Sequence, residues 1–183
     1  MMLKKLRNMI ESNICKGDFI MRIAGITKES IVDGPGIRLV VFAQGCKHGC
    51  IGCHNPDTHS LKGGQLIEIE KIVKLAQKNP LLDGVTFSGG EPFLQAKEFT
   101  ELGKELKKLG LNLIIYTGYT YEEIIESKNG DWYELLKVAD ILVDGKFEID
   151  KKSLELKFKG SSNQRMIDVK NSLSEEKIIE IEL

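Results

Sequence analysis

The sequence lacks an excess of either charge and any long apolar run. Lys and Arg number 26 against 27 Asp and Glu in 183 residues. This balance offers no basic stripe for nucleic acid, and no run reaches the roughly 18 apolar residues of a membrane span. The basic start is soon interrupted by Glu11, Asn13 and Lys16, which do not suit a signal-peptide core. We therefore expect a cytoplasmic protein that binds neither a membrane nor, directly, nucleic acid.

Cysteine is scarce, but three of the four cysteines, Cys46, Cys50 and Cys53, lie within eight residues. Closely spaced thiols without a secretion signal more often bind metal than form disulfides. Iron-sulfur cubanes are normally held by four thiolates, so three local ligands would leave one iron open to a substrate or cofactor. The alternative is a structural zinc site closed by His48 or His54. Cys15, far upstream, is interpreted as a small hydrophobe without chemistry.

Linker composition, internal repeats and low-complexity tracts are also missing. We predict a short amphipathic N-terminal extension over residues 1–20 and one domain over residues 21–183. An apolar run at residues 37–43 predicts a buried strand that leads directly to Cys46.

Further along, strands and helices alternate. Strands are predicted at residues 84–88, 111–116 and 141–143, and helices around residues 69–76, 99–109, 124–125 and 132–136. Such alternation predicts an α/β fold with a mostly parallel sheet, here of about six strands, too few for a closed eight-stranded barrel. In the less regular tail, we predict strands at residues 154–158 and 165–169, and a capping box formed by Ser172 and Glu175.

Chemistry in a parallel sheet gathers at the carboxyl ends of the strands. Ser88-Gly89-Gly90-Glu91-Pro92 follows one predicted strand. Its glycines expose backbone groups and its carboxylate can accept a hydrogen bond from an ammonium, although a plain turn with Pro92 starting a helix is the alternative. Thr117 to Thr120 is more typical of a capped turn before a helix.

Two later polar segments are also candidates. Asp144-Gly145-Lys146 ends a predicted strand and is either a surface turn or part of a site. Residues 160–165 form a polar cluster in which Asn163 and Arg165 could bind a carboxylate or a ribose, with a solvated loop as the alternative.

Together, these segments carry a family resemblance. CxxxCxxC after an apolar strand resembles the signature of the radical S-adenosylmethionine enzymes. The combination of GPGIR, CxxxCxxCHN, FSGGEP, YTGYTYEEI, VDGKF and GSSNQR resembles the activating proteins of anaerobic ribonucleoside-triphosphate reductases, across essentially residues 21–170. One departure is Gly52, which stands where many members of the superfamily have an aromatic residue before the third cysteine.

The resemblance implies a partial (β/α) barrel, one [4Fe-4S] cluster per chain and S-adenosylmethionine. It implies three cluster ligands, Cys46, Cys50 and Cys53, and seven cofactor contacts, namely Gly89, Gly90, Glu91, Asp144, Lys146, Asn163 and Arg165. The implied reaction uses a 5'-deoxyadenosyl radical to abstract hydrogen from a glycine of the partner reductase, with no catalytic side chain beyond the cluster ligands. An electron donor such as flavodoxin or ferredoxin is expected. We interpret His48, His54 and His59 as packing or surface residues rather than acid-base groups.

Several alternatives stay open from the sequence. The chain could activate another glycyl radical enzyme, such as pyruvate formate-lyase, or resemble a 7-carboxy-7-deazaguanine synthase. Outside these enzyme classes, it could be a zinc-stabilised binding module or a simple electron-transfer protein.

Overall fold

The computed structural model describes residues 19–182, which form one open sheet with helices on one side. The strand order is β3-β1-β2-β4-β5-β6-β7. Their bounds are β1 Ile20–Ser30, β2 Arg38–Ala43, β3 Gln65–Glu68, β4 Gly84–Gly89, β5 Asn112–Tyr116, β6 Ile141–Asp144 and β7 Arg165–Asp168. The helices are α2 Ile69–Lys78, α3 Ala96–Lys107, α4 Tyr121–Glu126, α5 Gly130–Val138 and α6 Val169–Glu175, with short 3-10 turns η1 Pro56–Thr58, η2 Pro92–Gln95 and η3 Ile149–Lys151.

The four central strands, β2, β4, β5 and β6, run parallel, whereas β1, β3 and β7 pair antiparallel. Parallel strands place their carboxyl ends at one edge of the sheet. Because β7 runs the other way, its amino end lies at that same edge, where Arg165 pairs with Asp144 of β6. The topology therefore gathers four strand ends and the start of a fifth at one edge.

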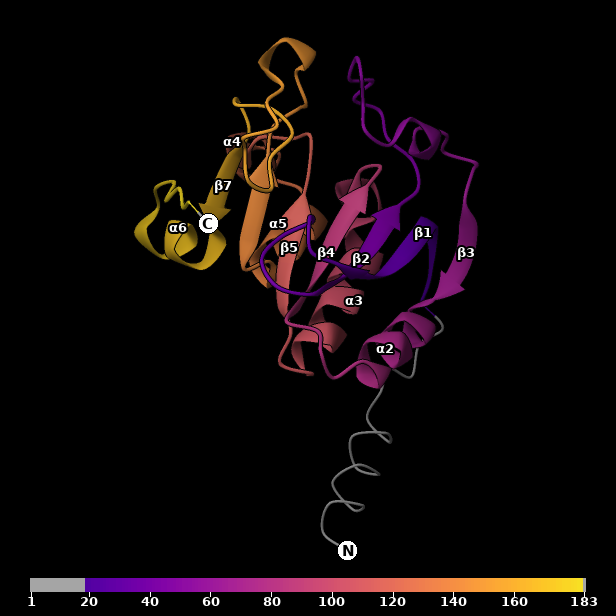
Figure 1. Ribbon diagram of the computed structural model, residues 1–183. Coiled ribbons are helices and arrows are strands. Elements are labelled where there is room, and N and C mark those ends of the chain that lie inside the picture. The colour runs from indigo at the N-terminus through magenta and orange to yellow at the C-terminus, as the bar shows by residue number, and fades with distance from the viewer. Residues whose placement is uncertain (1–18, 183) are drawn as a thin grey trace, which may run out of the picture.

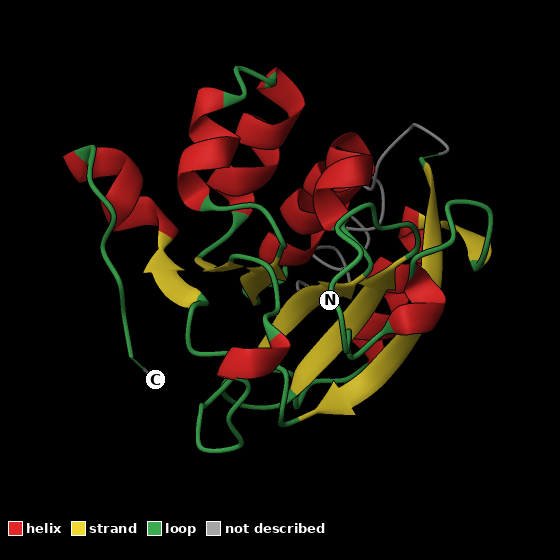
Figure 2. Cartoon of the chain, turned by 90° about the horizontal axis from the view of Figure 1, so that it is seen from above, coloured by secondary structure: helices red, strands yellow, loops and turns green. Residues whose placement is uncertain are grey.

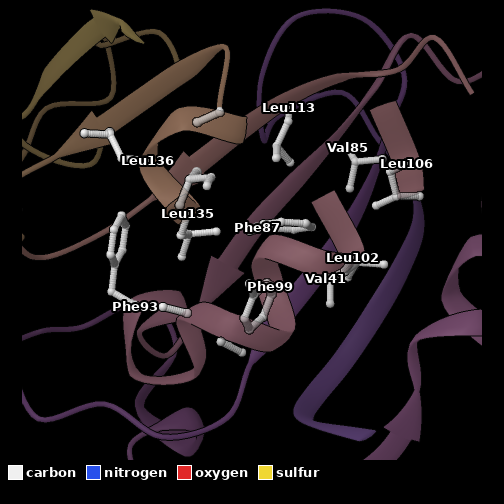
Figure 3. Packing of buried hydrophobic residues seen from close by; sticks show 14 of the residues in the cluster. Val41, Val85, Phe87, Phe93, Phe99, Leu102, Leu106, Leu113, Leu135 and Leu136 are labelled. Atoms are coloured by element: carbon white, nitrogen blue, oxygen red, sulfur yellow. The ribbon is translucent and has the colours of Figure 1, made fainter. Parts of the chain in front are cut away.

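One face of the sheet packs against α2, α3 and α5, and Figure 2 shows the helices on this side. Figure 3 shows strand residues such as Val85 and Phe87 pointing at Phe99 and Leu102 of α3. The Phe87 and Phe99 rings meet edge to face with centroids 4.8 Å apart. Each fully buried side chain of this kind contributes about 1.5–3 kcal/mol, so this face fixes the sheet beneath the strand ends.

The other face is crossed by residues 31–37, which pass in front of the central strands in Figure 1. Arg38 anchors this crossing: its buried guanidinium donates to Thr86 Oγ1 at 2.7 Å and to the carbonyls of Pro35, Val85 and Asn112. Burial lowers the pKa of Arg38 to about 10. Four hydrogen bonds to acceptors of the crossing and of the sheet tie this segment down.

The predicted α/β fold is confirmed, including the strands at residues 37–43, 84–88, 111–116, 141–143 and 165–169. The open sheet, with edge strands β3 and β7, has seven strands against about six expected. The structure adds β1 and the short edge strand β3, neither of which has a clear apolar pattern. Of the predicted extension, only residues 19 and 20 are among the described residues, and Cys15 lies outside them. A domain boundary at residue 21 stays a prediction.

Two predictions in the tail are wrong. Residues 154–158 form bends and a turn, because no strand edge lies beside them, and Leu154 is 93% exposed. Ser172 does not cap a helix but lies inside α6, where Asp168 is the N-cap and accepts from Asn171 N. The capping box occurs instead in α4, between Thr120 and Glu123, which confirms the predicted capped turn.

Among residues 19–182, none of the helices combines the length and the apolar character that crossing a bilayer would require.

Candidate functional site

The cysteine loop begins where β2 ends and is tied to the neighbouring strand end by its own backbone. Gly90 N donates to Ala43 O and Glu91 N donates to Gly45 O, each at 2.8 Å. Gly52 has φ +72°, and a Cβ at this position would lie 2.8 Å from the side chain of Ile149. A glycine is therefore needed just before the third cysteine, which explains the departure from an aromatic residue.

All three thiols of this loop line one cavity of about 460 Å³ at the carboxyl edge of the sheet. The same cavity is lined by Gly89 and Gly90 from the end of β4, Gly118 from the end of β5 and Gly145 from the end of β6. The topology thus brings the predicted cluster ligands and the predicted glycine turn to one concave surface, as expected for strand ends in a parallel sheet.

The donor set, three thiols on one cavity, is of the kind that holds an iron-sulfur cluster. Within residues 19–182, no three His, Cys, Asp or Glu side chains are close enough together to hold one metal ion. A tetrahedral zinc with Zn–S bonds of about 2.3 Å needs sulfurs roughly 3.8 Å apart. A cluster distributes its ligands over several metal ions. Burial raises the pKa of Cys46, and the negative charges of Glu91 and the other two thiolates raise it further. Binding to iron requires the thiol of Cys46 to lose this proton.

Glu91 is fully buried directly behind this cavity. Its carboxylate accepts hydrogen bonds from Phe93 N, Gly118 N and the Thr117 hydroxyl at 2.9–3.0 Å. The imidazole of His48 approaches the same carboxylate at 2.6 Å. The sequence indicated Glu91, but it gave no sign of these partners, which come from other segments of the chain.

Asp144 and Arg165 are joined in an ion pair at the neighbouring strand ends. Arg165 Nη2 donates to Asp144 Oδ2 at 2.5 Å and to Glu122 Oε2 at 2.7 Å. The hydrogen bonds that Arg165 donates to Glu122 and Asp144 raise the pKa of Arg165, and in turn Arg165 lowers the pKa of Glu122 to about 2. Asp144 is 1% exposed and also accepts from Tyr121 N.

These two residues line a second cavity of about 590 Å³ together with Lys146 and Asn163. Gly118 and Gly145 line both cavities, so the two adjoin. Asn163 donates to Lys146 O, and its buried Oδ1 has no hydrogen-bond partner among the described residues. The predicted cysteines and paired glycines thus line one cavity, and Asp144, Lys146, Asn163 and Arg165 line the adjoining one. Glu91 is buried and lines neither.

Gln164 was missed by the sequence reasoning, although it sits inside a predicted segment. Its side chain donates to Gly145 O and accepts from Gly160 N and Ser161 N, so it fixes the turn between the two cavities. A glutamine in a polar loop carries no pattern that distinguishes this role. His54, whose ring lies 4.7 Å from that of Phe147, and His59 also line the first cavity.

Comparison with known proteins gives a consistent result. A family model described as a 4Fe-4S single cluster domain matches residues 32–167. The chain is 41% identical over 128 residues to the pyruvate formate-lyase-activating enzyme of Clostridium pasteurianum, covering 67% of this chain and 50% of that enzyme. It is 33% identical over 141 residues to the anaerobic ribonucleoside-triphosphate reductase-activating protein of Enterobacteria phage T4, covering 74% and 86%. The corresponding protein of Escherichia coli K12 is also 33% identical, over 73% of this chain and 90% of that protein.

The chain thus spans about half the length of the first of these relatives and most of the other two. A solved structure, QueE from Escherichia coli, matches with a TM-score of 0.44 and 19% identity, covering 55% of this chain and 54% of that one. A likeness this weak carries no argument about function.

The chain is therefore a radical S-adenosylmethionine enzyme with a single [4Fe-4S] cluster. Within that class, it belongs to the glycyl radical enzyme activase family. This membership excludes two interpretations that the sequence left open, namely a zinc-stabilised binding module and a simple electron-transfer protein.

Proposed function

We propose that this protein generates the glycyl radical of an anaerobic ribonucleoside-triphosphate reductase. The observation that carries the proposal is the single cavity in which three thiols face the glycine turn after β4. A site of this kind holds a cluster and a small cofactor against each other at the edge of a rigid sheet. When bound, the cluster and S-adenosylmethionine would supply the one-electron radical chemistry that removes hydrogen from a glycine of the partner.

The chain's own residues bind and orient these groups. Cys46, Cys50 and Cys53 hold the cluster as thiolates. From behind the cavity, the buried carboxylate of Glu91 offers negative charge to the cofactor's ammonium, which lies beside the exposed backbone of Gly89 and Gly90.

The second cavity provides the remaining cofactor contacts. Lys146 and Arg165 offer positive charge to a carboxylate, and the unpartnered Oδ1 of Asn163 offers an acceptor to a ribose hydroxyl. Asp144 acts mainly through Arg165, whose guanidinium it holds at the edge of the cavity. Because Gly118 and Gly145 line both cavities, one elongated ligand could lie across them.

The rim of the first cavity suits a protein partner rather than a small molecule. Val32 lines the cavity and is 74% exposed, and Ile51, between two of the ligands, is 80% exposed. Exposed apolar residues around a site often mark contact with another protein. We infer that the glycine-bearing loop of the reductase enters here and excludes water from the radical.

Two segments that resemble the reductase activases support the choice of partner. Residues 116–124 supply the Thr117 and Gly118 donors to Glu91, and residues 160–165 supply Gln164 and Asn163. The resemblance therefore falls on residues that build the two cavities.

The test is anaerobic mixing of the cluster-loaded protein, a reductant, S-adenosylmethionine and a candidate reductase, followed by electron paramagnetic resonance. A glycyl radical on the reductase, absent without S-adenosylmethionine and absent with Cys50→Ala, is the expected result. No radical on any anaerobic reductase, from a protein that carries four irons, would refute the proposal. Flavodoxin and ferredoxin can be compared as electron donors in the same assay.

The second candidate is activation of pyruvate formate-lyase, which the 41% identity to the Clostridium pasteurianum enzyme favours. A parallel reaction with pyruvate formate-lyase distinguishes the two. A radical on the lyase and none on the reductase would assign the second function.

A further inference from the structure

The carboxylate of Glu91 has a full set of hydrogen-bond partners drawn from three segments of the chain. Phe93 N belongs to its own turn, and Gly118 N and the Thr117 hydroxyl follow β5. The fourth group, His48 Nε2, comes from the cysteine loop and makes the shortest contact, 2.6 Å to Oε2. A carboxylate offers about four acceptor positions, so these groups fix its orientation.

His48 itself sits in a built slot. Its side chain is 8% exposed. On one side lies Gly118, where an added Cβ would come within 2.5 Å of the imidazole. On another lies Tyr119, whose ring meets the imidazole edge to face at 4.5 Å and packs at 4.4 Å on Trp132 of α5. The ring position is therefore set by the sheet edge and by α5, not by the loop that carries it.

This arrangement links two parts of the site. His48 lies between the first two cluster ligands, Cys46 and Cys50, so a fixed imidazole also restricts the loop that carries these thiols. At its other end, the imidazole holds the carboxylate whose charge is proposed to attract the cofactor's ammonium. The backbone bond from Glu91 N to Gly45 O ties the same two segments together on the other side of Cys46.

We propose that His48 is a positioning residue that holds the Glu91 carboxylate and the cluster loop in one fixed arrangement. The imidazole donates through Nε2, for which the neutral ring with its proton on that nitrogen is sufficient. His48 acts through Glu91 and does not contact the cofactor. The inference rests on the proposed function and deepens it, because it explains how the cluster and the cofactor's amino group are held in a fixed position relative to each other.

The test uses the full chain loaded with its cluster under anaerobic conditions. His48→Ala removes the donor, and His48→Gln keeps a donor on a side chain of similar reach. Lys47→Ala is the matched control, since the neighbouring Lys47 side chain is exposed in the same loop. Three quantities are measured in each variant: iron per chain, the affinity for S-adenosylmethionine by calorimetry, and the change that S-adenosylmethionine causes in the spectrum of the reduced cluster.

We expect His48→Ala to keep its iron and to bind S-adenosylmethionine about tenfold more weakly, as for loss of one hydrogen bond to a charged group. Its spectral change at saturating cofactor should also differ from that of the wild type. His48→Gln should recover affinity to within about threefold of the wild type, and Lys47→Ala should bind normally.

Unchanged or tighter binding in His48→Ala would overturn the proposal, because the histidine would then be neutral or a competitor for Glu91. Equal weakening in the alanine and glutamine variants would overturn it as well, since ring packing alone would explain the effect. Loss of iron in both variants would assign His48 to the loop and not to Glu91. A wild-type protein that binds S-adenosylmethionine but forms no radical on a reductase would refute the proposed partner and leave the His48 result standing.

Discussion

Replacing Glu91 by glutamine is the sharpest single change for testing the cofactor site. Glu91→Ala would remove the acceptor for two backbone N–H groups and a threonine hydroxyl in a fully buried place, so it would confuse binding with unfolding. Glu91→Gln keeps the shape and removes the charge. Losing the attraction between the carboxylate charge and the cofactor's ammonium should weaken binding by about 1.5–3 kcal/mol, or roughly 10- to 150-fold in Kd.

The same substitution should also lower stability by a predictable amount. Both carboxylate oxygens accept from a backbone N–H, one from Phe93 and the other from Gly118. Whichever way the amide is oriented, its NH₂ group faces one of these donors, and the N–H left without an acceptor costs about 1–3 kcal/mol. In a domain of this size, each kcal/mol corresponds to about 2–4 °C in Tm. We therefore expect a loss of several degrees with a folded, iron-containing protein.

Calorimetric titration with S-adenosylmethionine, iron analysis and thermal unfolding give the three readouts. Glu70→Gln is a suitable control, because Glu70 is exposed on α2 and pairs with Lys74 of the same helix. Wild-type affinity in Glu91→Gln with intact iron would remove Glu91 from the cofactor site. A lower Tm without weaker binding would show that the carboxylate serves the fold alone.

Further predictions concern the ligands, the ion pair and the rim. Alanine at any one of the three cluster ligands should abolish cluster assembly, measured as iron per chain, whereas Cys15→Ala should not. Arg165→Ala should weaken S-adenosylmethionine binding while leaving iron intact. Because Arg165 holds the pKa of Glu122 at about 2, below its usual 4.5, the pair stabilises the fold above about pH 4.5 and this stability is lost as pH falls toward 2. Denaturant unfolding of Arg165→Ala across that range should therefore show a shallower acid dependence than the wild type. Ile51→Asp should reduce glycyl radical formation at limiting reductase by about tenfold, with unchanged cofactor affinity, if the rim is the docking surface.

The central sheet could be predicted because local pattern and final environment agree there. Residues 39–43 are apolar and largely buried on both faces, as a parallel strand between helices and a crossing segment requires. The edge strands were harder to predict, because their local pattern and their final environment do not agree. In β3, Leu66 is 61% exposed and the strand exists only because β1 offers an edge to pair with. In residues 154–158, an alternating pattern has no such partner and forms turns instead.

Within the site, the sequence identified residues but not their partners. The cysteine spacing is local, so the ligand set could be inferred from eight consecutive residues. The environment of Glu91 is not local: Gly118 lies 27 positions away and His48 lies 43 positions away. Without a fold, nothing in His48 distinguishes it from His54, which also follows the first cysteine closely but packs on Phe147 at the exposed side of the loop.

The same geometry explains why a chain with so few unusual residues can control a reactive radical. Chemistry of this kind needs little from acid-base side chains and much from rigid placement. The strand ends provide that placement: β2 carries the cysteine loop, β4 carries Glu91, and β5 supplies the hydrogen bonds that hold Glu91 still. A loop alone could bind iron, but only a loop fastened to the sheet edge fixes the distance between the cluster and the cofactor. Backbone bonds from Gly90 and Glu91 make that attachment, and the proposed role of His48 adds a side-chain contact to it. Removal of the imidazole should therefore appear in cofactor affinity before it appears in iron content.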